Sequence, residues 1–138
     1  MDKLEKLKIA HEIMSYLRAP DVFKNISDTF TLLNKLHNDA NMLTEKSFSN
    51  MTPENLRLFS LALIVEVTEF LQEFNWKEWK RNNKVVYRQK VTAEFADIIA
   101  FIGTLIVLLN SAGIHPEELA MAYLSKEAEN VNRFMKGY

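Results

Sequence analysis

The chain has no cysteine, and this absence excludes several kinds of site at once. Disulfides, thiolate zinc sites and cysteine nucleophiles all require a thiol. Glycine and proline are scarce, with three of each among 138 residues, which favours helix. The formal net charge of −1 gives no general basic surface of the kind that binds nucleic acid.

Long apolar runs are also absent. The longest, at residues 98–109, contains Gly103 and Thr104 and is shorter than the roughly 18 residues that a membrane span needs. It therefore predicts a buried helix. The first residues are charged and amphipathic, without the hydrophobic core of a signal peptide. We expect a cytoplasmic protein whose partners include neither a membrane nor a nucleic acid.

Apolar residues make up 48% of the chain and recur at helical spacing, with no strand-like alternation. Length and composition are those of a single domain over residues 1–138. The predicted helices cover residues 3–18, 22–43, 53–80, 91–110 and from 116 onward. A polar run at 81–84 separates the third helix from the fourth. The predicted fold class is all-α, a bundle of four or five helices.

Local signals set several of these boundaries. Pro20 is expected to end the first helix, and Asp21 is a suitable N-cap for the second. Thr52 followed by Pro53 is typical of a helix start, because proline at the first helical position lacks an N–H that would be unpaired there. Gly113 is expected to follow the fourth helix as its C-terminal cap.

The third predicted helix carries carboxylates where apolar residues are expected. Glu66 and Glu69 follow the apolar run 61–65 directly, and Glu73 comes one turn later. Residues three or four apart share a helix face, so Glu66 and Glu73 line up with Phe70 on the face expected to meet the core. A carboxylate in that position is costly unless a partner compensates for its desolvation.

The fourth predicted helix repeats this feature. Glu94 and Asp97 lie three apart, and Glu94 shares a stripe with Ile98 and Phe101. Because the connection between them is short, we expect the third and fourth helices to be antiparallel neighbours, so that the acidic pairs can meet. Four carboxylates would then repel one another strongly in a low-dielectric site.

Protonation would relieve this repulsion, and so would hard divalent cations, which prefer oxygen ligands. Mg²⁺ is the natural candidate, with Mn²⁺ as a possible substitute. The alternative is that the acids are solvated or belong to structural ion pairs, as is usual for a single acidic pair on a helix. Two such pairs on consecutive core-facing helices make a metal site a comparably good interpretation.

The fifth predicted helix supplies a complementary pattern. Lys126, Asn130 and Arg133 are four and three residues apart, and therefore share one face. A point charge, a neutral donor and a planar fork together suit phosphate oxygens. The same pattern is also found on solvated helix faces, so its meaning depends on the acidic motifs.

The ExxE, ExxD and KxxxNxxR motifs formed by these residues resemble those of the all-α nucleoside triphosphate pyrophosphohydrolases. That superfamily includes the MazG-like enzymes and the dimeric all-α dUTPases. The dUTPase branch is the most similar, because it has an aromatic and lysine segment like FNWKEWK, at residues 74–80, after its first acidic pair. Tyr123 also matches a tyrosine upstream of the terminal motif. The resemblance covers about residues 30–135.

Two departures from that branch fall at positions that are expected to contact the base. The early helix has His37 and Asn41 where the branch tends to have Gln and Asn. Ala100 precedes Phe101 where the branch tends to have His before Phe. These changes leave the phosphate motifs intact and leave the preference for uracil open.

The resemblance implies hydrolysis of a nucleoside triphosphate, favoured as dUTP, to the monophosphate and pyrophosphate. Glu69 is the expected general base. The implied metal ligands are Glu66, Glu69, Glu94 and Asp97. The implied substrate-binding residues are Lys126, Asn130, Arg133, Asn41, Trp76 and Trp79.

Several alternatives stay open at this point. Trp76 and Trp79 either stack on the base or seal the end of the third helix against the core or a partner subunit. The substrate is dUTP or another pyrimidine deoxynucleotide, such as dCTP or a modified base. The chain is either such an enzyme or a non-catalytic helical binding or assembly module. The resemblance also implies a homodimer or a higher homo-oligomer.

Overall fold

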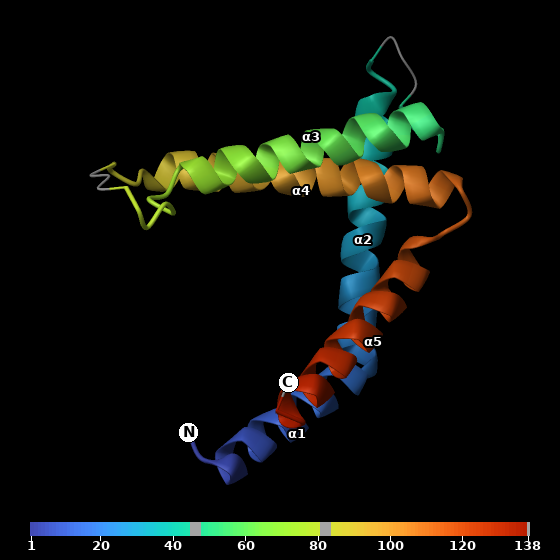
Figure 1. Ribbon diagram of the computed structural model, residues 1–138. Coiled ribbons are helices and arrows are strands. Elements are labelled where there is room, and N and C mark those ends of the chain that lie inside the picture. The colour runs from blue at the N-terminus through green and yellow to red at the C-terminus, as the bar shows by residue number, and fades with distance from the viewer. Residues whose placement is uncertain (45–47, 81–83, 138) are drawn as a thin grey trace. The chain divides into compact units, whose positions relative to one another are not determined.

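A computed structural model describes residues 1–44, 48–80 and 84–137, which form five helices and no strand (Figure 1). The helices are α1 (Lys3–Arg18), α2 (Pro20–Asn41), α3 (Pro53–Gln72), α4 (Arg88–Ser111) and α5 (Pro116–Met135). The predicted all-α class is confirmed.

The helices belong to two compact units, which are described separately. The first unit comprises Met1–Leu33 and Ile114–Tyr138, and the second comprises Asn34–Gly113. α2 continues from the first unit into the second, to which its last two turns belong. The single domain over residues 1–138 stays a prediction.

In the first unit, α1 lies beside α5 (Figure 1). A capping box starts α1: Glu5 N–H donates to the side chain of Asp2, and Asp2 N–H donates to that of Glu5. These bonds satisfy two donors that a helix start leaves unpaired. The buried residues of α5 are Pro116, Ala120 and Leu124, each four residues from the next. This spacing places them on one face of α5.

In the second unit, α3 lies along α4 (Figure 1). α4 contains the most deeply buried part of the described chain, with Ile106, Val107 and Leu108 each no more than 5% exposed. By length and composition α4 alone among the described helices is apolar enough to cross a membrane, but the core helix of a soluble protein meets the same criteria. Six residues of the run 98–109 are buried, whereas Ile99 and Ile102 are exposed, so the helix predicted to be buried is buried only in part.

The predicted caps are confirmed at two boundaries of this unit. Asn55 N–H donates to the Thr52 hydroxyl at 3.0 Å, and Pro53 is the first residue of α3. Gly113 follows the end of α4 with φ of +89°, in the left-handed region that glycine adopts readily.

The boundary between α1 and α2 differs from the prediction. α2 begins at Pro20 rather than Val22, and Ala19 is the C-cap of α1. Pro20 thus opens a helix instead of only ending one, because the first helical position needs no N–H donor. Asp21 lies inside the first turn, where its negative charge interacts favourably with the positive end of the helix dipole.

The third helix is shorter than predicted, ending at Gln72 rather than near residue 80. The chain folds back beyond that point: the Lys84 ammonium donates to the Gln72 carbonyl, and the Asn75 amide donates to the Lys84 carbonyl at 2.9 Å. Lys84 therefore satisfies a carbonyl that the end of α3 leaves unpaired. The break predicted at 81–84 lies mostly outside the described residues.

Candidate metal centre

Two aromatic contacts join α3 to α4 near the acidic residues. The rings of Phe59 and Phe101 have centroids 6.3 Å apart, and those of Phe70 and Phe95 are 5.6 Å apart. The later residue of α3 pairs with the earlier residue of α4, so the two helices are antiparallel. This register places Glu66, Glu69 and Asp97 between the two aromatic contacts, and Glu94 directly precedes Phe95 in the sequence.

The α3–α4 pair brings three of the four predicted metal ligands together. One carboxylate oxygen from each of Glu66, Glu94 and Asp97 lies within 4.8 Å of the other two. Glu66 and Glu94 are half-buried, whereas Asp97 is exposed. Such a group of carboxylate oxygens has the chemistry that hard divalent cations prefer.

Two oxygens of this acidic cluster (Glu66, Glu94 and Asp97) lack any protein partner. Oε2 of Glu66 and Oε2 of Glu94 are both buried, and neither accepts a hydrogen bond within the described chain. A buried anionic oxygen without a partner is costly. A bound cation would remove that cost, so these residues fit a metal ion.

The fourth predicted ligand, Glu69, lies beside the cluster and is exposed. Burial, followed by the charge of Glu69, raises the pKa of both Glu66 and Glu94 above the ordinary value. Asp97 raises both values further, and Glu73 adds to the effect on Glu94. The acids thus repel one another as the sequence predicted.

The end of α2 meets α4 at a position where α4 has no side chain. A Cβ atom added at Gly103 would lie 2.1 Å from Cδ2 of His37, so the imidazole occupies the space that any other residue would fill. Such a separation is far below van der Waals contact. The His37–Gly103 contact therefore requires glycine on α4 as long as the ring stays in place.

Two asparagines flank His37 on the same face of α2. Oδ1 of Asn34 and Nδ2 of Asn41 are buried and have no hydrogen-bond partner within the described chain. Asn34, His37 and Asn41 are three and four residues apart, so they share the face that meets α4. Sequence reasoning selected Asn41 and missed Asn34, although this spacing was available as a signal.

The two tryptophans lie in the segment after α3. Their rings meet edge to face with centroids 5.8 Å apart, and Trp79 is 73% exposed. The Lys77 ammonium lies 5.4 Å from the centroid of the Trp76 ring. A pocket of about 250 Å³ is lined by Gln72, Phe74, Trp76, Lys77, Lys80 and Lys84. Trp79 therefore covers no core within the second unit, and its exposed ring has free area for stacking.

A family model described as dUTPase matches residues 22–111, which is more than half of the chain. The chain belongs to the dUTPase family. No curated protein and no solved structure matches it. The match includes both acidic pairs, Asn41 and the two tryptophans. Membership of the dUTPase family indicates a nucleotide diphosphatase activity in general.

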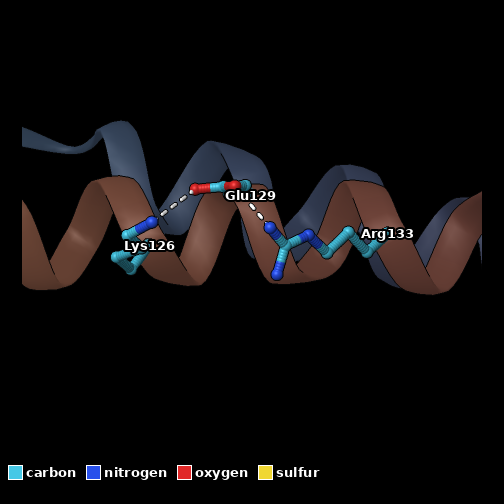
Figure 2. A network of polar contacts seen from close by, with 3 residues as sticks. All are labelled: Lys126, Glu129 and Arg133. Atoms are coloured by element: carbon cyan, nitrogen blue, oxygen red, sulfur yellow. Dashed lines mark hydrogen bonds and ion pairs between the residues drawn. The ribbon is translucent and has the colours of Figure 1, made fainter. Parts of the chain in front are cut away.

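The KxxxNxxR motif lies beyond the part of the chain that matches the dUTPase family. Lys126, Asn130 and Arg133 belong to α5 in the first unit and share one face of that helix. Glu129 lies between the two cations (Figure 2): it accepts hydrogen bonds from Lys126 at 3.2 Å and from Arg133 at 2.8 Å. The sequence interpretation missed Glu129, although its spacing from the two cations could have revealed the pairing.

The two cations change the acidity of Glu129. The hydrogen bond and charge of Lys126, followed by the charge of Arg133, lower the pKa of Glu129 below its ordinary value. The carboxylate is therefore ionised throughout the neutral pH range. It occupies donors of Lys126 and Arg133 that were predicted to bind phosphate.

Proposed function

We propose that the protein hydrolyses a nucleoside triphosphate, with dUTP the favoured substrate, to the monophosphate and pyrophosphate with the help of Mg²⁺. Membership of the dUTPase family supports this reaction. The observation that carries the proposal is the pair of buried, unpartnered oxygens of Glu66 and Glu94. A divalent cation is the partner that such oxygens lack.

In this proposal Glu66, Glu94 and Asp97 hold the metal, and Glu69 completes the ligand set. Mn²⁺ is a possible substitute for Mg²⁺ because both prefer oxygen ligands. A bound metal polarises phosphoryl oxygens and lowers the pKa of water. The chain's own contribution is to hold the carboxylates within reach of one another before any ion binds, as their 4.8 Å grouping does.

Glu69 has the proposed role of general base. It is exposed beside the cluster, where its carboxylate can orient a water molecule and accept its proton. The water oxygen forms the new bond to phosphorus, and the bond between the α- and β-phosphates breaks. Pyrophosphate leaves with the electron pair of that bond, and the nucleoside monophosphate keeps the water oxygen.

Lys126 and Arg133 are proposed to bind the triphosphate, with Asn130 fixing its position. The ammonium provides a compact charge, and the guanidinium provides a planar pair of donors. Donors held in place before the reaction stabilise charge that develops on the phosphate oxygens. The three side chains share a face of α5, so they can act on one ligand.

For the base, we propose contacts from Asn41 and from Trp76 and Trp79. Asn41 has a buried amide nitrogen without a partner, and each tryptophan has an exposed ring area. His37 is packed on Gly103, and Ala100 presents only a methyl group. These two differences from the related branch favour including dCTP and modified pyrimidine nucleotides as candidate substrates.

We also propose that the protein belongs with the MazG-like enzymes in one superfamily. A separate proposal is that it is a homodimer or a higher homo-oligomer. Leu58, Leu61 and Val65 of α3 are each at least half exposed, and their spacing places them on one face. Contiguous exposed apolar patches of this kind are typical of association surfaces. Sedimentation equilibrium checks this point: a monomer at micromolar concentration would contradict it.

A pyrophosphate-release assay over a panel of nucleoside triphosphates, with and without Mg²⁺, tests the proposed reaction. We expect release from dUTP that requires Mg²⁺ and is restored in part by Mn²⁺. Faster release from dCTP or another pyrimidine would retain the reaction and change the base. A folded protein that releases no pyrophosphate from any nucleotide would instead be a non-catalytic helical module.

A further inference from the structure

The net charge of the chain averages over segments of opposite sign. Residues 74–90, FNWKEWKRNNKVVYRQK, contain six lysines and arginines and one glutamate, which is a formal charge of +5. The other 121 residues carry −6, since the whole chain carries −1. A low net charge is therefore compatible with one strongly basic segment, which follows α3 and ends in the first turn of α4.

Hydrogen bonds hold the two ends of this basic segment (residues 74–90) together. The Lys84 ammonium donates to the Gln72 carbonyl, and the Asn75 amide donates to the Lys84 carbonyl at 2.9 Å. Trp76, Lys77 and Lys84 line the same pocket of about 250 Å³. The part that follows α3 and the part that precedes α4 therefore form one surface of the second unit.

The cations of the basic segment have no carboxylate partner. Among the described residues, none of Lys77, Lys80, Arg88 and Lys90 forms an ion pair. Arg88 and Lys90 lie in the first turn of α4, where the positive end of the helix dipole disfavours cations. Each of the other four described helices has an acidic residue in its first turn, and α4 has none. These charges therefore do not stabilise the helix start, and an anionic partner would offset their cost.

Each exposed aromatic ring of the segment is followed directly in the sequence by a cation. The pairs are Trp76–Lys77, Trp79–Lys80 and Tyr87–Arg88. Tyr87 is the N-cap of α4 but forms no side-chain cap hydrogen bond, so the helix start does not account for an aromatic residue there. The Lys90 ammonium lies 5.3 Å from the centroid of the Tyr87 ring, so a cation and a ring lie together at this position.

A ring beside a cation, repeated along one segment, matches the chemistry of a single nucleic acid strand. Each nucleotide of such a strand has a base, which stacks on an aromatic ring, and a phosphate, which interacts with a cation. In a duplex the bases are stacked on one another, so their faces are not accessible. In a bilayer the charged headgroups and the apolar chains form separate layers. The single strand is therefore the partner that this pattern fits best.

We propose that the basic segment binds single-stranded nucleic acid, with its exposed rings stacking on bases and its cations contacting phosphates. This proposal goes beyond the hydrolysis proposed above, because Lys80, Tyr87, Arg88 and Lys90 belong neither to the acidic centre nor to the proposed nucleotide contacts. Binding should be independent of base sequence, since every base has a face for stacking and every nucleotide has a phosphate.

Fluorescence anisotropy of the full chain with a labelled oligo(dT) of about 15 nucleotides tests the proposal. We expect binding that weakens as the salt concentration rises, because the protein's cations replace counterions of the strand. A duplex of the same length should bind more weakly. Binding of oligo(dT) or oligo(U) supports the proposal, and comparing the two distinguishes DNA from RNA. Absence of binding to both strands at low salt would overturn it.

Two pairs of charge variants test the phosphate contacts. Lys80→Gln combined with Lys90→Gln should reduce the slope of log affinity against log salt by about 1.4, which is about 0.7 for each phosphate contact. Lys3→Gln combined with Lys8→Gln makes the same change of charge at exposed positions of α1 and should leave the slope unchanged. Equal reductions in the two double variants would overturn the proposal, since net charge would then explain them.

A separate variant tests stacking. Tyr87→Leu keeps an apolar side chain and removes the ring, so it should weaken oligo(dT) binding roughly five- to hundredfold, as for the loss of one stacked base. Tyr16→Leu, at an exposed position of α1, is the matched control and should bind like the wild type. Circular dichroism checks that each variant keeps its helix content. Unchanged affinity in a folded Tyr87→Leu protein would contradict stacking at this ring.

Two competitors test other occupants of the segment. Excess dUTP without Mg²⁺ should displace oligo(dT) only in part, because Tyr87 and Lys90 lie outside the proposed nucleotide contacts. Complete displacement would overturn the proposal, since the strand would then merely occupy the nucleotide site. Binding to vesicles of phosphatidylcholine and phosphatidylserine in equal parts, without binding to oligo(dT), would also overturn it and indicate a membrane surface. Glu69→Gln should keep oligo(dT) binding, so failure at this segment is distinguishable from failure of the proposed hydrolysis.

Discussion

The glutamates of the two units show opposite responses to their surroundings. In the second unit, burial and neighbouring carboxylates raise the pKa of Glu66 and Glu94. In the first unit, Lys126 and Arg133 lower the pKa of Glu129. The ionised form of glutamate is therefore disfavoured in the second unit and favoured in the first. The difference indicates which carboxylates need a partner from outside the chain.

The neighbours at helical spacing account for this contrast. Glu129 has a lysine three residues before it and an arginine four residues after it, so its counter-charges come from its own helix. Glu66 has Glu69 one turn later, and across the pair of helices it meets Glu94 and Asp97. No cation balances the cluster among its described contacts, which is why a metal ion fits there.

The largest expected effect comes from removing the proposed base of the acidic centre. Glu69→Gln should lower kcat by roughly 10²- to 10⁴-fold, the usual contribution of general base catalysis. Pyrophosphate release measures the change, and circular dichroism checks the helical fold. Full turnover by a folded Glu69→Gln protein would remove Glu69 from the mechanism.

The effect of Mg²⁺ on stability should depend on the glutamates of the acidic cluster and not on Glu129. At a concentration about 100 times its Kd, a ligand that binds only the folded state adds roughly 2.7 kcal/mol of stability. We expect Mg²⁺ to raise the Tm of the wild type, to do so less in Glu94→Gln, and to act on Glu129→Gln as on the wild type. Melting curves with and without Mg²⁺ measure this. An equal shift in all three proteins would place the ion outside the acidic cluster.

The contact between α2 and α4 provides a test of how firmly the acid-bearing unit is packed. Gly103→Ala should destabilise the protein by about 1–3 kcal/mol, because the new methyl group and the His37 ring require the same space. Urea denaturation measures the change. Combining it with His37→Ala should relieve the clash, so the two effects should not add. Simple additivity would show that the ring moves aside freely.

The smallest expected effects are those on stability as a function of pH, and they should have opposite signs in the two units. The ordinary pKa is 4.5 for each glutamate. Where folding raises the pKa, as for Glu66 and Glu94, the contribution is present below 4.5 and is lost as the pH rises through the folded value. Where folding lowers it, as for Glu129, the contribution is present above 4.5 and is lost as the pH falls through the folded value.

Urea denaturation between about pH 3 and 8 without Mg²⁺ therefore has a distinct expected result for each variant, since the loss attributed to Glu129 falls below pH 4.5. Glu94→Gln should reduce the loss of stability that accompanies rising pH. Glu129→Gln should reduce the loss that accompanies falling pH. The same direction of change in both variants would contradict the contrast between the two units.

Much of the fold was predictable because it depends on residues close together in sequence. Thr52 with Pro53 and the glycine at 113 act through neighbouring backbone groups, so the sequence alone predicts both boundaries. The end of α3 was not predictable, because it depends on Lys84 reaching back to Gln72. No proline or glycine near residue 72 marks that end.

In the candidate site, too, the features set by neighbouring residues were predictable and the others were not. The stripe that carries Glu66 on α3 follows from helical periodicity, and so does the stripe that carries Glu94 on α4. Asn34 was missed because its spacing from His37 and Asn41 shows a shared helix face but does not show that this face is buried. Glu129 was missed because the KxxxNxxR motif specifies no residue type at the position of Glu129, between its two cations.

Because residue 103 is glycine, the His37 ring packs directly on α4, and positions 37 and 103 depend on each other although they lie 66 residues apart. A smaller residue at position 37 would open a notch on α4 that a water molecule or part of a ligand can enter. A larger residue at position 103 would expel the imidazole from it. Attempts to redesign base preference should therefore vary the two positions jointly, as one library, rather than in turn.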